Sequence, residues 1–392
     1  MGLPLWKVAC ARHLGLQVGV LEKWPTALAG ASQRRNRRKK RLVRSLWHGP
    51  WDAPVFGSLK ALEDAWLGDC WGVRADFEQR GRRKGNSMAI ASHLASVGAT
   101  RDVLSRHGLA TKHSLGQNFL VNDAVIANIC KLSEVCEEDN VLEVGPGIGT
   151  LTVALLPRAK HVLSIERDPD LPAVLDETCD DFDNFTLIGK DALRLNDDDL
   201  IAAFGKQAVE AGEAPNKFIS NLPYAVAATL VLDYFQRIPS LQSATVMVQS
   251  EVADRMEAVV GTKDYAAYSV KLQLIAKATG RFQVSPGNFF PPPRVTSSVI
   301  RLDRRSDLGL SAEEIANASM AADAAFFTRR KTISNSMKGY FSSRGEQGKA
   351  IAAKLPEILA EAGIDAKRRG ETLELSEFVE LGRVLAKAKA EE

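Results

Sequence analysis

A glycine-rich segment, V-L-E-V-G-P-G-I-G-T-L-T (residues 141–152), has the composition of a loop that binds a nucleotide-like cofactor. An apolar run leads into Gly145, Gly147 and Gly149, and a helical pattern follows. Glycines at such a place permit positive φ and let a ligand approach the backbone at a helix N-terminus. The spacing is G-x-G-x-G, unlike the dinucleotide fingerprint G-x-G-x-x-G, and Glu143 precedes the first glycine by two residues. The segment therefore favours S-adenosylmethionine, which has no pyrophosphate to bind.

Three acidic residues, Glu143, Glu166 and Asp191, lie within or just after successive apolar runs. Glu166 follows Gly145 by 21 residues, where the end of a second strand presents a carboxylate to ribose hydroxyls. Asp191 is suited to accept a hydrogen bond from an adenine amino group. One acid at a strand end is more often a helix cap, but three behind a glycine-rich turn predict a binding site. Ligands of open α/β sheets bind at the carboxyl ends of the strands.

The tetrapeptide Asn221-Leu222-Pro223-Tyr224 has the residue types needed to activate a base amine. Such an amine is a weak nucleophile because its lone pair is conjugated with the ring. The Asn221 amide oxygen and a backbone carbonyl can accept both amine hydrogens, so that the lone pair points at an electrophilic methyl group. Pro223 fixes the turn, and the Tyr224 ring offers a face on which an extruded base stacks. An ordinary turn with a buried tyrosine is the alternative, and the position after a fourth strand favours catalysis.

An open sheet is needed to bring these residues together. The expected strands are 141–144, 162–166, 185–189, 218–220 and 245–249, and the expected helices between them are about 149–158, 170–181, 225–237 and 250–258. This alternation predicts an α/β fold with a Rossmann-like, mostly parallel sheet. Apolar runs near 270–276 and 297–302 are expected to add antiparallel strands at one edge.

Helical patterns flank the expected sheet on both sides. One or two short helices are predicted within 91–107, with Thr100 as a helix N-cap, and another over 123–132. Residues 311–392 are rich in Ala, Glu, Lys and Leu, with breaks expected at Pro356 and Gly370. We therefore expect a small helical C-terminal domain over 306–392 and a catalytic domain over 88–305.

The charge of the 392-residue chain is unevenly distributed. The whole carries 51 Lys and Arg against 48 Asp and Glu, which excludes an extreme polycation or an acidic tail protein. Residues 1–87, however, have 17 basic and 7 acidic residues and contain all six tryptophans, whereas 88–392 have 34 basic and 41 acidic residues. We expect 1–87 to be a basic, poorly ordered extension. It is either an arm that neutralises RNA phosphates or, as the patterning favours, a poorly ordered tail or a translated stretch upstream of a functional start at Met88.

Cysteine usage and hydropathy restrict the compartment. The five cysteines form no C-x-x-C and have no histidines at zinc-ligand spacing, so no metal site and reduced thiols are expected. No run of about 18 apolar residues occurs, which excludes a membrane span, and the N-terminus lacks the pattern of a secretory signal. A cytoplasmic protein is expected.

Six segments, in order, resemble the ribosomal RNA adenine N6-dimethyltransferases that act on the small subunit. They are K-H-S-L-G-Q-N-F-L (112–120), the glycine-rich segment, S-I-E-R-D (164–168), N-L-P-Y, M-V-Q-S-E-V-A-D-R (247–255) and F-F-P-P-P-R-V-T-S-S-V (289–299). The resemblance covers about 107–305 and 326–340, and nothing in 1–87 belongs to it. It implies a Rossmann-like S-adenosylmethionine-dependent domain followed by a small helical domain.

The resemblance also implies roles for individual residues. Those implied to bind the cofactor are Asn118 and Leu120 at its methionine end, Gly145 in the loop, Glu166 at the ribose, Asp191 at the adenine, and Asn221. Those implied to act in catalysis are Asn221, the carbonyl of Pro223, and Tyr224 and Phe289, which would stack on opposite faces of the target adenine. Ala225 stands where relatives usually have a polar residue, which leaves its effect on target contacts open.

RNA contacts are expected at Lys112 and at the basic triplet Arg329, Arg330 and Lys331. A basic triplet on a helix is more often a solvated face, but the family's helical domain carries the same run and contacts RNA. The resemblance implies dimethylation of N6 of two adjacent adenines in a hairpin near the 3′ end of small-subunit (16S) ribosomal RNA. The expected partner is the pre-30S subunit, bound by a monomer with a role in small-subunit biogenesis.

Two alternatives remain. One is the related large-subunit methyltransferase that confers antibiotic resistance, which shares the cofactor site and an N-x-P-Y motif. The segments F-F-P-P-P and F-F-T-R-R-K-T-I-S-N (326–335) favour the small-subunit enzyme. The other is an assembly factor that acts mainly by binding RNA, against which the intact Glu166, Asp191 and 221–224 argue.

Overall fold

The computed structural model describes residues 90–112 and 116–390. The expectations for 1–87 and for a start at Met88 lie outside these residues, and the domain limits at 87/88 and 305/306 stay predictions. No helix in the described ranges is long and apolar enough to span a membrane.

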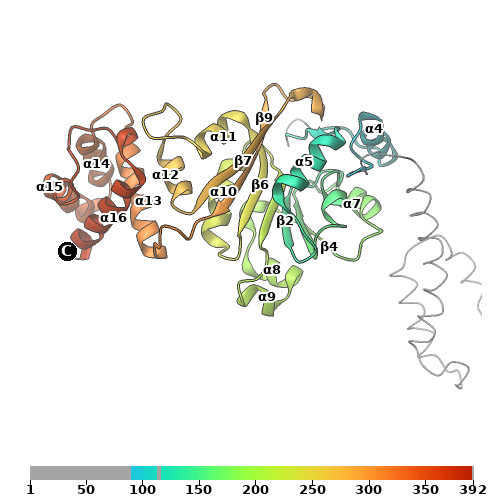
Figure 1. Ribbon diagram of the computed structural model, residues 1–392, viewed down its shortest axis with the longest axis horizontal. Helices are drawn as coiled ribbons and strands as arrows, with labels where there is room; N and C mark the ends of the chain where they lie inside the picture. The colour runs from blue at the N-terminus through green and yellow to red at the C-terminus, as the bar shows by residue number, and fades with distance from the viewer. Residues whose placement is uncertain (1–89, 113–115, 391–392) are drawn as a thin grey trace, which may run out of the picture. The chain divides into compact units, whose positions relative to one another are not determined.

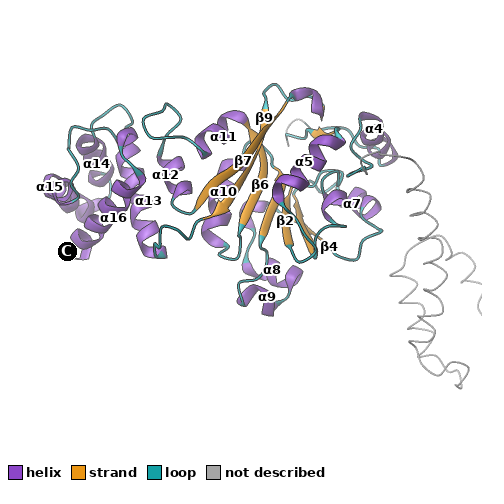
Figure 2. Cartoon of the chain, in the orientation of Figure 1, coloured by secondary structure: helices purple, strands orange, loops and turns teal. Residues whose placement is uncertain are grey.

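One seven-stranded sheet forms the centre of the described part of the chain, in the order β4-β3-β2-β5-β6-β9-β7 (Figures 1 and 2). Its strands are β2 (Asn140–Val144), β3 (His161–Glu166), β4 (Phe185–Gly189), β5 (Lys217–Asn221), β6 (Ser243–Gln249), β7 (Ala276–Val284) and β9 (Ser297–Arg304). Strands β2 to β6 pair in parallel, and β9 pairs antiparallel with β6 and β7. The chain adds β3 and β4 on one side of β2 and then β5 and β6 on the other. The point between β2 and β5 is therefore a topological switch, where ligands of such sheets bind.

Helices cover both faces of the sheet, because successive strand residues point to opposite sides. Val141, Val162 and Ile219 belong to one buried cluster, with apolar residues of α4 to α7. Their neighbours Leu142 and Phe218 belong to a second cluster, with α8 and α10 to α12. These helices are α4 (Val97–Arg106), α5 (Asp123–Ser133), α6 (Thr152–Leu155), α7 (Pro172–Thr178), α8 (Asp197–Phe204), α9 (Lys206–Glu210), α10 (Ala227–Arg237), α11 (Ser250–Met256) and α12 (Ala267–Gln273). The predicted α/β, Rossmann-like fold is confirmed.

The chain after β9 is helical, as predicted. Its elements are α13 (Ala312–Phe326), α14 (Ile333–Ser342), α15 (Gly345–Glu361), the 3₁₀ turn η6 (Gly370–Thr372) and α16 (Leu375–Ala390). These helices bury their apolar residues in the same cluster as α10 to α12. The Lys271 ammonium donates to Asp323 at 2.8 Å, which adds an ion pair between α12 and α13.

Three local predictions are wrong. The N-cap of α4 is Ser96, whose hydroxyl accepts from the Ala99 N–H at 3.1 Å, and Thr100 lies inside the helix, fully buried. Residues 270–273 of the expected strand 270–276 belong to α12, which packs against α13, and the edge strand β7 starts only at Ala276. Pro356 lies inside α15, where the buried Leu355 and Ile358 on either side of it hold the helix together.

The structure also contains a two-stranded ribbon that the sequence does not predict. Strand β1 (Phe119–Leu120) pairs antiparallel with β8 (Phe289–Phe290), so that Leu120 lies opposite Phe289. Two residues are too few to show strand periodicity. The ribbon joins two of the six segments that carried the family resemblance.

Candidate active site

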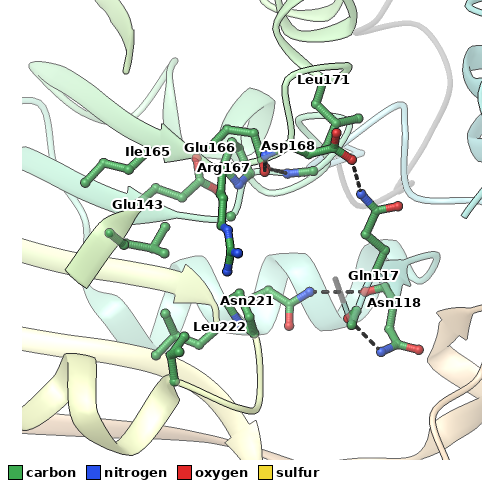
Figure 3. A pocket seen from close by; sticks show the side chains of 18 of the residues that line it. Gln117, Asn118, Glu143, Ile165, Glu166, Arg167, Asp168, Leu171, Asn221 and Leu222 are labelled. Carbon is green, nitrogen blue, oxygen red and sulfur yellow. Dashed lines mark hydrogen bonds between the residues drawn. The ribbon is translucent and has the colours of Figure 1, made fainter. Parts of the chain in front are cut away.

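A cavity of ≈ 580 Å³ lies at the carboxyl ends of β2, β3, β4 and β5 (Figure 3). All six residues predicted to bind the cofactor line it: Asn118, Leu120, Gly145, Glu166, Asp191 and Asn221. Pro223, Tyr224 and Ala225 also line it, so the site that the sequence proposed in separate segments is one space.

The glycine-rich turn shapes one wall of this cavity. Gly145, Gly147 and Gly149 have φ values of 67°, 60° and 88°, which L side chains rarely adopt. A Cβ on Gly147 would lie 3.0 Å from Cε1 of Phe119, and one on Gly149 would lie 2.9 Å from Oγ1 of Thr178. The turn therefore requires glycine for both conformation and space.

Glu166 ends β3 with its carboxylate against this turn. Its Oε1 accepts from the Asp168 N–H at 2.7 Å and its Oε2 from the Gly147 N–H at 3.4 Å. Burial raises the pKa of Glu166, and the backbone N–H donors oppose that shift. An anion held by backbone donors at a strand end is an acceptor fixed for a neutral donor such as a sugar hydroxyl.

Glu143 is bound by different partners. Its Oε2 accepts from the hydroxyls of Ser164 at 2.6 Å and Thr152 at 2.8 Å, which ties β2 to β3 and α6. The side chain is 1% exposed, and burial raises the pKa of Glu143 to about 7. Although it borders the cavity, its carboxylate is engaged within the protein.

Asp191 follows β4 and caps the 3₁₀ turn Ala192–Arg194. Its Oδ1 accepts from the Leu193 N–H at 3.1 Å. The cap and the cavity position occur together, so the helix-cap interpretation and the binding interpretation are compatible for this residue.

Asn221 and Tyr224 are both anchored across elements. The Asn221 side-chain N–H donates to the Asn118 carbonyl at 3.4 Å, which leaves the amide oxygen as an acceptor (Figure 3). The Tyr224 hydroxyl hydrogen-bonds to that of Ser297 on β9 at 2.7 Å, and burial raises the pKa of Tyr224. The ring is thereby fixed beside the cavity that it lines.

Phe289 is placed elsewhere. It is 3% exposed, belongs to the cluster of α4 to α7, and is absent from the residues that line the cavity. The following Phe290 is partly exposed and carries the Arg101 guanidinium 5.0 Å from its ring centroid. Of the two aromatic residues predicted to stack on the target adenine, only Tyr224 lines the cavity in this structure.

The predicted RNA-binding residues differ in how their charge is used. Lys112 donates to Asp168 at 2.6 Å and to Asp170 at 2.5 Å, and these bonds raise its pKa. Arg329 pairs with Glu371 at 3.1 Å. Arg330 and Lys331 are exposed and form no ion pair within the described part of the chain.

Other polar residues near these sites were missed. Gln117, Arg167 and Asp168 line the cavity, and Figure 3 shows the Arg167 side chain extending across it. Gln117 and Asp168 belong to the family segments, and their neighbours Asn118 and Glu166 were the available signal. Exposed Lys367 and Arg369 flank Arg368, whose carbonyl accepts from the Ile333 N–H at 2.7 Å, close to the basic triplet.

Comparison with known proteins decides the family. Residues 108–381 match the model of a family described as ribosomal RNA adenine dimethylase. The chain belongs to this ribosomal RNA adenine dimethylase family. The predicted resemblance is thus confirmed. The dimethylase is 36% identical to "Ribosomal RNA small subunit methyltransferase A" of Clostridium botulinum (strain Okra / Type B1), over 72% of this chain and 96% of that protein. It is also 36% identical to the protein of that name in Enterococcus faecalis (strain ATCC 700802 / V583), over 77% and 99% of the two chains.

Solved structures share the fold of the dimethylase. A dimethyladenosine transferase from Plasmodium falciparum aligns with a TM-score of 0.57 and 23% identity, over 69% of this chain and 98% of that one. The 23S rRNA methyltransferase ErmE aligns with a TM-score of 0.50 and 24% identity, over 69% and 100%. At these identities both comparisons concern the fold.

Proposed function

We propose that this dimethylase uses S-adenosylmethionine to dimethylate N6 of two adjacent adenines in a hairpin near the 3′ end of small-subunit ribosomal RNA. The observation that carries the proposal is a single cavity, in a member of this family, that joins Glu166 and Asp191 to Asn221 and Tyr224. The two bacterial relatives are named for the small subunit and match the chain over nearly their whole length.

The residues present fit the cofactor. Glu166 offers a fixed carboxylate for a ribose and Asp191 an acceptor for an adenine amino group, at the carboxyl ends of neighbouring strands. The glycine-rich turn gives backbone access, and Asn118 and Leu120 line the same space. When bound there, S-adenosylmethionine supplies an electrophilic methyl group.

The chain contributes acceptors and a stacking surface for the target base. The Asn221 amide oxygen and the Pro223 carbonyl accept the two hydrogens of the adenine amine, which directs its lone pair toward the methyl group. The Tyr224 ring supports the extruded base, a contact worth about 1–3 kcal/mol. Rate enhancement comes from positioning and from these preorganised acceptors, with neither a metal nor a covalent enzyme intermediate. Each transfer would form a nitrogen–carbon bond as the sulfonium–carbon bond breaks, and would release one amine proton. In the second transfer the methylated amine keeps a single hydrogen, so only one of the two acceptors would hold it.

The helical C-terminal part is assigned to substrate recognition, through contacts with the charged phosphates of the RNA backbone. Arg330 and Lys331 are exposed and available for phosphates, and structured RNA is recognised mainly by shape and backbone contacts. We propose that the dimethylase acts as a cytoplasmic monomer on the pre-30S particle, in small-subunit biogenesis. Phe289 would join Tyr224 at the base only after leaving its buried position.

Methyl transfer tests the function directly. Labelled cofactor is incubated with immature small subunits and, separately, with large subunits. We expect label in the small subunits alone, and Asn221→Ala should lower transfer at least about 100-fold, as for removal of a transition-state acceptor, without changing the thermal unfolding midpoint. Label confined to large subunits would favour the antibiotic-resistance activity. Intact cofactor binding and particle binding without transfer would favour an assembly factor.

A further inference from the structure

Asp168, two residues beyond Glu166, is a buried carboxylate at the edge of the cavity. Its side chain is 2% exposed and accepts hydrogen bonds from Lys112 Nζ at 2.6 Å and Gln117 Nε2 at 2.7 Å. The Asp170 N–H donates to it as well, at 3.1 Å. Burial of an ion is costly unless donors compensate for lost water, so this convergence of three donors requires an explanation.

The two side-chain donors come from one stretch of chain, far from Asp168 in sequence. Lys112 and Gln117 are also bonded to each other, since the Lys112 N–H donates to Oε1 of Gln117 at 2.9 Å. Gln117 is followed by Asn118, which lines the cavity and whose carbonyl accepts from the Asn221 side chain at 3.4 Å. The position of the Asn221 amide is thereby coupled to the anchorage of Gln117.

On its other side, Asp168 contacts the end of β3. Its N–H donates to Oε1 of Glu166 at 2.7 Å, and Oε2 of Glu166 accepts from Gly147 in the glycine-rich turn. Asp168 thus lies between the carboxylate assigned to the ribose and the segment that contacts Asn221 (Figure 3).

We propose that Asp168 is a positioning residue that holds Lys112 and Gln117 against the end of β3 and so sets the position of Asn118 and Asn221 at the cofactor. Asp168, Lys112 and Gln117 are called the Asp168 latch below. The proposal rests on the proposed function and reassigns Lys112, expected from sequence to contact RNA, to cofactor binding.

The charge states are consistent with a latch that is closed near neutral pH. Burial acts to raise the pKa of Asp168, but the hydrogen bonds from Lys112, Asp170 and Gln117 outweigh it and hold the pKa below its usual value. The hydrogen bond to Asp168, and then that to Asp170, raises the pKa of Lys112. Stabilisation from Asp168 is lost only as the pH falls through its lowered pKa, and that from Lys112 only as the pH rises through its raised pKa.

Asp170 provides a matched control. It pairs with the same Lys112 ammonium at 2.5 Å, but its side chain is 50% exposed and the bond to Gln117 is made by Asp168. An exposed ion pair contributes little on its own. Asp168→Asn and Asp170→Asn therefore each remove one charge facing Lys112, and only the first alters the partner of Gln117.

The first experiment measures binding of S-adenosylhomocysteine to the full chain by calorimetry. We expect Asp168→Asn to weaken binding at least about tenfold and Asp170→Asn less than about threefold. With small subunits as substrate, Asp168→Asn should lower kcat and raise KM for the cofactor, with KM for the particle unchanged. Equal cofactor affinity of wild type and Asp168→Asn would overturn the latch. Cofactor binding by wild type without transfer to small subunits would overturn only the proposed function.

Lys112→Met is the second experiment and separates the latch from an RNA contact. We expect weaker cofactor binding, an unchanged salt dependence of particle binding, and no additional weakening when Lys112→Met is added to Asp168→Asn. A salt-dependence slope reduced by about 0.7–0.9, with cofactor affinity unchanged, would make Lys112 a phosphate contact and overturn the proposal. Lys112 is one-third exposed, so this variant tests the latch even if Asp168→Asn fails to fold.

Discussion

At the scale of single residues, three of the acids at the site, Glu143, Glu166 and Asp168, have different hydrogen-bond partners and different tasks. Glu143 binds two hydroxyls inside the protein, Glu166 is held by backbone N–H groups at the cavity, and Asp168 receives side chains from a distant segment. Their different environments follow from which neighbours can donate. Only Glu166 combines a fixed carboxylate with a place at the ribose end of the proposed cofactor site.

Glu143→Gln is expected to stabilise the cofactor-free protein at alkaline pH. Burial raises the pKa of Glu143 from 4.5 to about 7. The contribution of the neutral Glu143 side chain to the free energy of unfolding is therefore fully present below pH 4.5 and is lost as the pH rises through about 7. Glutamine stays neutral, and its oxygen can accept from the same hydroxyls. The free energy of unfolding at pH 8 should rise by on the order of 3 kcal/mol, with little change at pH 4.5. Denaturant unfolding at both pH values checks this.

An exposed acid provides the control for that prediction. Glu137→Gln alters a carboxylate at the surface, and we expect its unfolding free energy to follow wild type within about 0.5 kcal/mol at both pH values. If Glu143→Gln kept the pH dependence of wild type, the buried carboxylate would not be its source.

The sequence predicted which residues lie together at the site more successfully than it predicted the role of each residue there. Six of the residues that line the cavity were predicted to bind the cofactor, because glycines, strand-end acids and Asn221 lie in recognisable segments. The task of Lys112 was not accessible, since its partner Asp168 is 56 residues away and either interpretation suits a lysine in a polar loop. The buried position of Phe289 likewise depends on its pairing with β1.

At the scale of elements, tertiary packing overrides local pattern where the two conflict. The five parallel strands were predicted within one or two residues, because apolar runs bounded by polar turns are local signals. The apolar run at the end of α12 predicts a strand, but its packing against α13 stabilises a helix. Pro356 predicts a helix break, but the buried face of α15 keeps the helix continuous. Neither contact is encoded in the segment itself.

The contact between α13 and α16 depends on a glycine, which gives an element-scale prediction. A Cβ on Gly382 of α16 would lie 2.6 Å from the Ala318 backbone nitrogen of α13, so Gly382→Ala forces two backbones apart. We expect a loss of about 1–3 kcal/mol of unfolding free energy. Gly339→Ala is the control in α14: its Cβ would lie 3.4 Å from Phe327, a tolerable contact, and should stabilise by up to about 1 kcal/mol. Equal losses in the two variants would contradict close packing at Gly382.

At the scale of the whole molecule, the net negative charge of residues 88–392 does not match the negative charge of the proposed RNA substrate. Residues 88–392 carry 34 basic against 41 acidic residues, although the proposed substrate is a polyanion. Many of the described arginines and lysines are paired with acids, as Arg329 is with Glu371 and Arg383 with Glu314. Within the described residues, attraction to RNA must therefore come from the cations that the fold leaves without acidic partners, and the net charge of 88–392 is a poor guide to it.

Arg330 and Lys331 are the test of that view, because they are exposed and form no ion pair in the described residues. The logarithm of the RNA association constant falls as the logarithm of the salt concentration rises. Removing one cation that binds a phosphate should make this slope less steep by about 0.7–0.9. The double variant Arg330→Gln with Lys331→Gln should therefore make it less steep by about twice that amount. Arg329→Gln, next in sequence but paired with Glu371, should change it less. Particle binding measured over a range of salt concentrations gives the slopes, and cofactor affinity should stay constant. Equal slopes for all three proteins would place the RNA on another surface.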